Sequence, residues 1–364
     1  MSQLQFMKGN EAMAEAAILA GCKYYFGYPI TPQNEVPAYM AKRMPEIEGV
    51  FIQAESEVAA INMVFGAAVT GARAMTSSSS PGISLKQEGI SYMAACELPG
   101  VIANIQRGGP GLGSIGPSQA DYWQATRGGG HGDYRTIVLA PHTIDEVVGL
   151  TMDAFDLADY YRNPVVILSD GLLGQMMEKV EFPNLEIRRE QGLLRGREIP
   201  IKDWILTGSK NREPRKIRSL LMKTGELEEH NYHLADKYQK ITQQEATAEE
   251  IACEDAELII IAYGSPARLA KQAQVELAKQ GKRIGVFRPI TLWPFPTQQL
   301  AKWTSKVNNF LVVEMSLGQM LEDVKLSLGQ EKSFGSINIQ LLAKPGGAVP
   351  LAEDIQEKII EVLS

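Results

Sequence analysis

The sequence has few cysteines, and their arrangement does not suit a metal site. Only Cys22, Cys96 and Cys253 occur among 364 residues, and no two of them form a C-x-x-C pair. This spacing argues against a disulfide framework, a zinc site or an iron–sulfur cluster held by this chain alone. It is typical of a protein of the reducing cytoplasm, and we expect no metal ligands on this chain.

Long apolar runs and blocks of like charge are also missing. No stretch approaches the roughly 20 apolar residues that cross a bilayer, and the amino-terminal residues do not combine a basic stretch with an apolar one. The 36 basic and 43 acidic residues leave a net charge of −7 without a basic patch. We therefore expect a cytoplasmic protein that binds neither membrane nor nucleic acid.

The sequence does contain short apolar strands that alternate with helices. From residue 1 to about 180 this alternation predicts an α/β fold with a doubly wound, mainly parallel sheet. Residues 181–250 lose the alternation and are predicted to be a connecting segment. It resumes over 251–364 as a second, smaller α/β domain. Within it, the aromatic and proline loop 292–296 is expected to be exposed as a subunit contact.

Two prolines enclose Thr31 directly after the aromatic strand 24–28. The turn Pro29-Ile30-Thr31-Pro32 has a backbone restricted by its prolines. It could be only a rigid turn from a strand to a helix. It could also present the Thr31 hydroxyl at the carboxyl end of a strand, where open α/β sheets bind their ligands.

Glu57 lies where the next strand runs into a helix. Residues 50–52 read as the strand, Ser56 as the helix cap and residues 57–72 as the helix. A carboxylate in the first turn is favoured by the helix dipole, so Glu57 has a structural explanation. A functional role for Glu57, or for the neighbouring Glu55, is the alternative.

Arg107 ends an apolar strand and precedes Gly108-Gly109-Pro110. A cation at this position could hold a carboxylate or phosphate, or could form a structural salt bridge. No Rossmann or P-loop fingerprint accompanies it. His131, alone among glycines, is a weak candidate for ligand contact. His230 and His233 do not predict a metal site.

Nine segments, in this order, resemble one family: the alpha subunits of the 2-oxoacid:ferredoxin oxidoreductases, which use thiamine diphosphate. The resemblance extends over both predicted domains and leaves out the connecting segment. The segments are Gly27–Pro32 (GYPITP), Glu55–Ala60 (ESEVAA), Ser79–Leu85 (SSPGISL), Gln106–Pro110 (QRGGP), Gly129–Asp133 (GGHGD), Val165–Asp170 (VVILSD), Tyr263–Arg268 (YGSPAR), Arg288–Pro296 (RPITLWPFP) and Val313–Gln319 (VEMSLGQ).

The resemblance implies roles for single residues. Glu57 matches the glutamate that hydrogen-bonds a nitrogen of the cofactor's pyrimidine ring, which lets the cofactor act as its own base. Pro29, Ile30 and Thr31 fall in the segment that lines the cofactor. The Thr31 hydroxyl and the Arg107 guanidinium match the groups that hold the substrate carboxylate.

It also implies two domain types. Residues 1–180 would bind the pyrimidine half of thiamine diphosphate, and 251–364 would resemble the C-terminal domain of transketolase. The implied reaction is the oxidative decarboxylation of a 2-oxoacid to acyl-CoA and CO2, with coenzyme A as co-substrate and ferredoxin as electron acceptor. Residues 128–134 and 136–141 resemble the branched-chain, 2-oxoisovalerate members more than the 2-oxoglutarate members.

Half of such an active site is missing from the sequence. Thiamine enzymes normally hold the diphosphate and its Mg²⁺ with a Gly-Asp-Gly motif followed by Asn-Asn, and the chain has no Gly-Asp-Gly. The resemblance therefore implies a beta subunit that carries this site and a ferredoxin-like gamma or delta subunit with iron–sulfur clusters, assembled as a dimer of heteromers. The alternatives are a 2-oxoglutarate enzyme, a non-redox thiamine enzyme component and a non-catalytic scaffold.

Overall fold

The computed structural model describes residues 4–329 and 337–364. Its strands are β1 (Gln5–Lys8), β2 (Tyr24–Gly27), β3 (Val50–Gln53), β4 (Ala74–Ser78), β5 (Gly100–Gln106), β6 (Ile137–Leu139), β7 (Pro164–Asp170), β8 (Met177–Val180), β9 (Ala248–Ile251), β10 (Leu258–Ile261), β11 (Ile284–Pro289), β12 (Thr291–Trp293), β13 (Asn309–Glu314) and β14 (Asn338–Ala343). Its α-helices are α1 (Gly9–Leu19), α2 (Glu35–Arg43), α3 (Glu57–Ala68), α4 (Ser80–Ala95), α5 (Tyr122–Arg127), α6 (Ile144–Tyr161), α7 (Gly171–Gln175), α8 (Leu185–Gln191), α9 (Glu226–Glu245), α10 (Gly264–Lys279), α11 (Thr297–Ala301), α12 (Gln319–Leu328) and α13 (Ala352–Leu363), with 3-10 turns at Met44–Ile47 and Lys302–Ser305.

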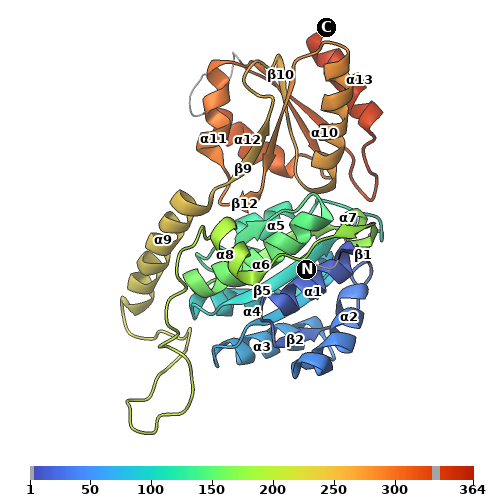
Figure 1. Cartoon of the computed structure of the whole chain (residues 1–364). Coiled ribbons are helices and arrows are strands. Elements are labelled where there is room, and N and C mark those ends of the chain that lie inside the picture. Colours follow the sequence, from blue (N-terminus) through green and yellow to red (C-terminus); the bar gives the residue numbers. More distant parts are fainter. Residues whose placement is uncertain (1–3, 330–336) are drawn as a thin grey trace.

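These strands form two large sheets and a small ribbon. One large sheet has the order β12-β6-β7-β5-β4-β2-β3, the other has the order β14-β13-β10-β11-β9, and β1 pairs with β8. Figure 1 shows the second sheet with its helices, in orange and red, above the first sheet with its own helices. Both sheets are parallel except for one edge strand each, β12 and β9. The predicted α/β class with a doubly wound, mainly parallel sheet is confirmed.

The parallel strands bring several chain segments to one edge of the first sheet. Strands β2, β3, β4, β5 and β7 run in the same direction, so their carboxyl ends lie side by side. The central strand β5 is buried along its whole length, as expected of a parallel strand covered by helices on both faces. The residues that follow these strands include Thr31, Glu57 and Arg107.

The segment 292–296 differs from its prediction as an exposed loop. Residues 291–293 form β12, which pairs antiparallel with β6 at the edge of the first sheet. Leu292 is fully buried, and Trp293 and Phe295 pack against the core. The expectation of exposure was wrong because these aromatic side chains join the two halves of this chain to each other.

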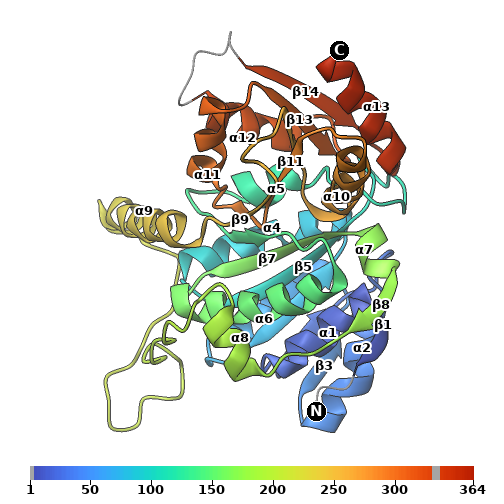
Figure 2. The same ribbon diagram turned by 45° about the horizontal axis from the view of Figure 1, so that its top comes forward.

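The connecting segment contains more regular structure than its charged sequence suggested. Figure 2 shows α9, in yellow, standing at one side of the molecule. The buried residues of α9 recur at the spacing of one side of a helix and are Leu234, Tyr238, Ile241 and Glu245. Upstream of α9, ion pairs hold the segment to α6: Arg188 pairs with Asp153, Arg189 with Asp156 and Lys202 with Asp159. No helix in the described part of the chain is long and apolar enough to span a membrane.

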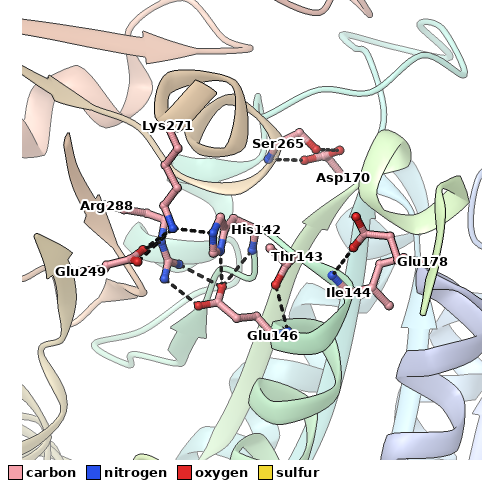
Figure 3. Close-up of polar contacts among 10 residues, drawn as sticks. All are labelled: His142, Thr143, Ile144, Glu146, Asp170, Glu178, Glu249, Ser265, Lys271 and Arg288. Carbon is pink, nitrogen blue, oxygen red and sulfur yellow. Dashed lines mark hydrogen bonds and ion pairs between the residues drawn. The ribbon is translucent and has the colours of Figure 1, made fainter. Parts of the chain in front are cut away.

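A buried ionic network joins the two sheets through Arg288, as Figure 3 shows. Arg288 is 1% exposed and donates to Glu146 Oε1 at 2.6 Å and to Glu249 Oε2 at 2.7 Å. Lys271 Nζ lies 2.7 Å from His142 Nε2, and His142 Nδ1 lies 2.6 Å from Glu146 Oε2. Because Glu146 lies on α6 of the first sheet and Arg288 on β11 of the second, each half supplies charges that the other half neutralises.

The Glu146 carboxylate should make stability depend on pH. Burial would raise its pKa, but the hydrogen bond from His142 and the charge of Arg288 outweigh burial and lower the pKa to about 2. A carboxylate with a lowered pKa stabilises the fold above its ordinary pKa of 4.5 and loses that contribution as the pH falls toward 2. We expect Glu146→Gln to lower the free energy of unfolding at pH 7 by about 3 kcal/mol, and at pH 3 by about half of that or less.

Urea denaturation of both proteins at pH 7 and pH 3 measures this difference. Glu254→Gln is the matched control, because Glu254 pairs with Lys306 on the surface, where its side chain is 68% exposed. Such a pair contributes about 1 kcal/mol or less. Equal losses for Glu146→Gln at the two pH values would contradict the assignment of its stabilising effect to the ionised carboxylate.

Candidate active site

Thr31 lies in a segment that crosses the carboxyl edge of the first sheet. The carbonyl of Pro32 accepts hydrogen bonds from Asn10 Nδ2 and Gln175 Nε2, both at 2.8 Å, and these fix the segment against α1 and α7. The Thr31 hydroxyl is exposed, and its only polar neighbour among the described residues is Asn34 Nδ2 at 3.4 Å. The turn therefore presents a hydroxyl outward from a backbone that is held in place.

Glu57 begins α3 and is nearly buried, at 6% exposure. Ser56 caps the helix by accepting from the Ala59 N–H at 3.2 Å, as the sequence predicted. The helix ends at Ala68, earlier than the predicted residue 72. No described residue donates a hydrogen bond to the Glu57 carboxylate, whereas Glu55 is exposed. The Glu57 oxygens are not among the buried unpartnered atoms of the described structure, so the carboxylate is a candidate for binding a group from outside the chain.

Lys86 is a residue of this site that the sequence analysis missed. It is fully buried on α4, and its Nζ lies 3.4 Å from the backbone carbonyl of Glu57. Burial lowers the pKa of Lys86 to about 8, and the nearby Glu57 carboxylate opposes that shift. The sequence spacing could have indicated this burial. Lys86 lies on the same face of α4 as Ile83 and Ile90, which is the apolar face that packs against the core.

The first turn of α4 surrounds the Glu57 carboxylate with small residues. A Cβ atom at Gly82 would lie 2.6 Å from Glu57 Oε1 and closer still to Ser78 Oγ, so only glycine fits there. The hydroxyls of Ser78 and Ser79 are buried without a hydrogen-bond partner in the described structure. Buried hydroxyls are usually satisfied, which makes these two further candidates for contact with a bound group.

Arg107 follows β5 and is held by backbone carbonyls instead of carboxylates. Its Nη1 donates to the carbonyl of Thr31 at 2.9 Å and its Nη2 to the carbonyl of Leu112 at 3.3 Å. Its Nε is buried without a partner, and no described carboxylate forms an ion pair with it. Arg107 therefore forms no structural salt bridge with the described residues. Its positive charge is free to pair with an anion from outside the chain.

Ser80 connects Arg107 to the turn beside Glu57. Its Oγ accepts from the Arg107 N–H at 3.1 Å and donates to Asp121 Oδ2 at 2.6 Å. Burial raises the pKa of Asp121, and hydrogen bonds from Ser80 and Asn104 oppose that shift. Thr31 and Arg107 are thus in direct contact. Glu57 lies against the first turn of α4, next to Gly82, and no described contact links it to Thr31 or Arg107. Pro29 and Ile30 lie in the Thr31 segment, and no described contact links them to Glu57.

The other candidates lie apart from this cluster. Arg127 pairs with Asp323 at 3.0 Å on α12. His131 packs edge-on against Tyr92 and, with His230, lines a separate cavity of about 430 Å³. Within residues 4–329 and 337–364, no group of three or more histidine, cysteine or acidic side chains could hold a metal ion.

Comparison with known proteins decides the family. Residues 15–250 match the thiamine-diphosphate-binding region of pyruvate flavodoxin/ferredoxin oxidoreductases. Residues 256–355 match core domain II of pyruvate:ferredoxin oxidoreductase. The chain belongs to the 2-oxoacid:ferredoxin oxidoreductase family. The resemblance drawn from the nine sequence segments is confirmed.

Individual members of the 2-oxoacid:ferredoxin oxidoreductase family match over nearly the whole chain. Ketoisovalerate oxidoreductase subunit VorB of Methanothermobacter marburgensis is 46% identical over 98% of this chain and 97% of its own length. 2-Oxoglutarate synthase subunit KorA of Methanothermobacter thermautotrophicus is 35% identical over the full length of both. Both names denote subunits, so the chain is a subunit of a thiamine-diphosphate-dependent oxidoreductase of this family and requires partner subunits.

Solved structures agree with this assignment. The 2-oxoglutarate:ferredoxin oxidoreductase from Magnetococcus marinus, with 2-oxoglutarate, coenzyme A and succinyl-CoA bound, superposes with a TM-score of 0.85 at 26% identity. The match spans all of this chain and 66% of that one. A split-gene transketolase shares the fold, with a TM-score of 0.61 at 14% identity over 98% of each chain.

Proposed function

We propose that this chain supplies the pyrimidine-binding half of the active site of a 2-oxoisovalerate:ferredoxin oxidoreductase. The enzyme converts 2-oxoisovalerate and related branched-chain 2-oxoacids, with coenzyme A, to acyl-CoA and CO2, and two electrons pass to ferredoxin. The observation that carries the proposal is the guanidinium of Arg107, which touches the Thr31 segment and pairs with no described carboxylate. It can receive the carboxylate that every 2-oxoacid carries.

The residues around Glu57 fit thiamine diphosphate. A nearly buried side chain whose carboxylate has no donor from this chain, beside a glycine that leaves no room for a Cβ and the unpartnered Ser78 hydroxyl, suits a flat polar ring with hydrogen-bonding edges. Glu57, with Pro29, Ile30 and Thr31 from the neighbouring segment, would hold the pyrimidine half. When bound, thiamine diphosphate supplies a nucleophilic carbon and stores the electron pair that decarboxylation leaves behind.

The chain's own residues would then control the protonation of the cofactor and the charge and position of the substrate carboxylate. Glu57 would hold a proton between its Oε atom and the facing ring nitrogen, and so control the protonation state of the bound cofactor. Arg107 would neutralise the substrate carboxylate while the Thr31 hydroxyl donates a hydrogen bond to it. Lys86, buried beside Glu57, would compensate the charge of that carboxylate.

The same proposal includes the partners and their groups. A beta subunit would carry the diphosphate and Mg²⁺ site, and a ferredoxin-like gamma or delta subunit would carry the iron–sulfur clusters, in a cytoplasmic dimer of heteromers. Within this chain, residues 1–180 would form the cofactor domain, 181–250 the connecting segment and 251–364 the transketolase C-terminal-like domain.

The substrate class is supported by a cavity of about 450 Å³ beside Thr31. Ile115, Pro117 and Leu172 give it an apolar wall, and Glu35 adds a carboxylate. None of the described residues that line it is basic, and Arg127, the other candidate cation, already pairs with Asp323. Arg107 and Glu57 do not line this cavity. A branched alkyl group suits such a wall, and the described residues of this chain offer no cation there to the second carboxylate of 2-oxoglutarate. The relative named for ketoisovalerate supports the same choice.

Purification of the native complex with its partner subunits tests this function. The complex should show iron–sulfur absorbance and reduce ferredoxin only when a 2-oxoacid and coenzyme A are both present. We expect kcat/KM for 2-oxoisovalerate to exceed that for pyruvate and for 2-oxoglutarate by about tenfold or more. Pyruvate lacks two carbons of the branched alkyl group, each worth about tenfold or more, and 2-oxoglutarate adds an unpaired charge. A preference for 2-oxoglutarate would favour the alternative substrate, and turnover without ferredoxin would favour a non-redox thiamine enzyme.

A further inference from the structure

The loop that follows Arg107, residues 108–117, closes back on this residue; we call it the arginine loop. The N–H of Gly108 donates to the carbonyl of Gly116 at 2.9 Å, and the N–H of Ser114 donates to the carbonyl of Gly108 at 2.8 Å. Leu112, at the loop tip, supplies one of the two carbonyls that hold the Arg107 guanidinium. The position of the guanidinium therefore depends on the shape of the loop.

Backbone atoms of the second domain lie in close contact with backbone atoms of the arginine loop. A Cβ atom at Gly116 would lie 2.9 Å from both the Cα and the carbonyl oxygen of Gly347. A Cβ atom at Gly108 would lie 3.0 Å from the carbonyl carbon of Gly346. Gly346 and Gly347 belong to the turn between β14 and α13. Because no side chain intervenes at these contacts, nothing there can rotate away to absorb a displacement.

Hydrogen bonds fix the exit of the arginine loop to the same domain. The N–H of Gln119 donates to the carbonyl of Met315 at 3.0 Å, and Gln119 Oε1 accepts from the Met315 N–H at 2.9 Å. Gln119 Nε2 donates to the carbonyl of Tyr263 at 2.9 Å. Met315 follows β13 and Tyr263 follows β10, so the loop is bound to the end of the second sheet.

We propose that the second domain positions Arg107 for the substrate carboxylate, with Gly116 and Gly347 as the positioning residues. The backbone contact between them fixes the conformation of the arginine loop, and the loop fixes the position of the Arg107 guanidinium. This inference rests on the proposed function of Arg107. It assigns to the transketolase-like domain an influence on substrate binding that passes through the arginine loop, because none of its described side chains hydrogen-bonds to Arg107 or Thr31.

Gly116→Ala in the assembled complex tests the proposal. The added methyl group must displace Gly347 or the loop, so KM for 2-oxoisovalerate should rise about tenfold, the effect of one weakened charged hydrogen bond, while kcat changes less than threefold. Gly109→Ala is the matched control, because a Cβ there meets no atom within 4 Å and neither glycine has a positive φ. The affinity for thiamine diphosphate should stay unchanged in both variants.

A double-mutant cycle separates this inference from the proposed function. If Gly116→Ala acts through Arg107, it should raise KM little further when combined with Arg107→Ala. An equal tenfold rise in both backgrounds, or no rise beyond that of Gly109→Ala, overturns the positioning role. If Arg107→Ala alone leaves KM unchanged, the proposed role of Arg107 fails instead.

A second pair of variants covers the case in which Gly116→Ala does not assemble. Gly347→Ala would place a Cβ 3.1 Å from Ser114 Oγ at a φ of +103°. Gly281→Ala, in a distant turn with a φ of +79° and no atom within 4 Å, introduces the same kind of backbone strain without the contact. A higher KM in Gly347→Ala than in Gly281→Ala, at matched thermal stability, supports the inference, and equal KM values overturn it.

Discussion

Glu57→Gln should lower the 2-oxoacid-dependent and coenzyme A-dependent reduction of a dye by the assembled complex about 1,000-fold, within the usual range for loss of a positioned proton-transfer group. Glutamine has the same shape as glutamate and fits beside Gly82, so the packing of α3 against α4 should survive. It cannot, however, hold the proton that the pyrimidine nitrogen requires. The loss should therefore fall on kcat, with little change in KM for the 2-oxoacid.

Glu55→Gln is the matched control for this prediction. Glu55 lies two residues before Glu57, in the same motif, but its side chain is exposed. We expect its activity to stay within threefold of the unchanged complex, because solvent and salt screen the charge of an exposed carboxylate. Full activity of Glu57→Gln would instead mean that this carboxylate only begins a helix.

The positions of the candidate residues in the fold could be predicted because they depend on local patterns. Ser56 predicts where α3 starts, and an apolar run predicts where β5 ends, just before Arg107. Parallel strands then bring such ends to one edge of the sheet. These rules place Thr31, Glu57 and Arg107 at the same edge without any knowledge of their partners. The family resemblance added the role that each residue would have.

Contacts between distant segments could not be predicted in this way. Spacing along the chain left open whether Arg107 forms a salt bridge, and the answer depends on the carbonyls of Thr31 and Leu112. The pairing of β12 with β6 depends on how the two sheets dock, which no periodicity encodes. The contact of Gly116 with Gly347 joins residues more than two hundred positions apart, and a glycine in a sequence does not say what approaches it.

Arg107→Ala should raise KM for 2-oxoisovalerate about 100-fold, since a charged hydrogen bond or ion pair with the substrate carboxylate would be lost. Arg107→Lys should recover part of this loss, because lysine keeps the charge but not the planar fork that also bonds the carbonyls of Thr31 and Leu112. Steady-state kinetics over a wide range of substrate concentration measures both effects.

Arg127→Ala is the control. Arg127 already pairs with Asp323, so its removal should change KM less than threefold.

The Arg107 and Glu57 variants should also differ from each other in the kinetic constant that changes. A substrate-binding cation controls occupancy and therefore KM, whereas a carboxylate that controls the protonation of a cofactor changes kcat. Similar kinetic defects in both variants would mean that the cluster at the carboxyl edge of the first sheet fails as one structural unit. A defect in KM for the Arg107 variants and in kcat for the Glu57 variant would show that one residue binds the substrate and the other activates the cofactor.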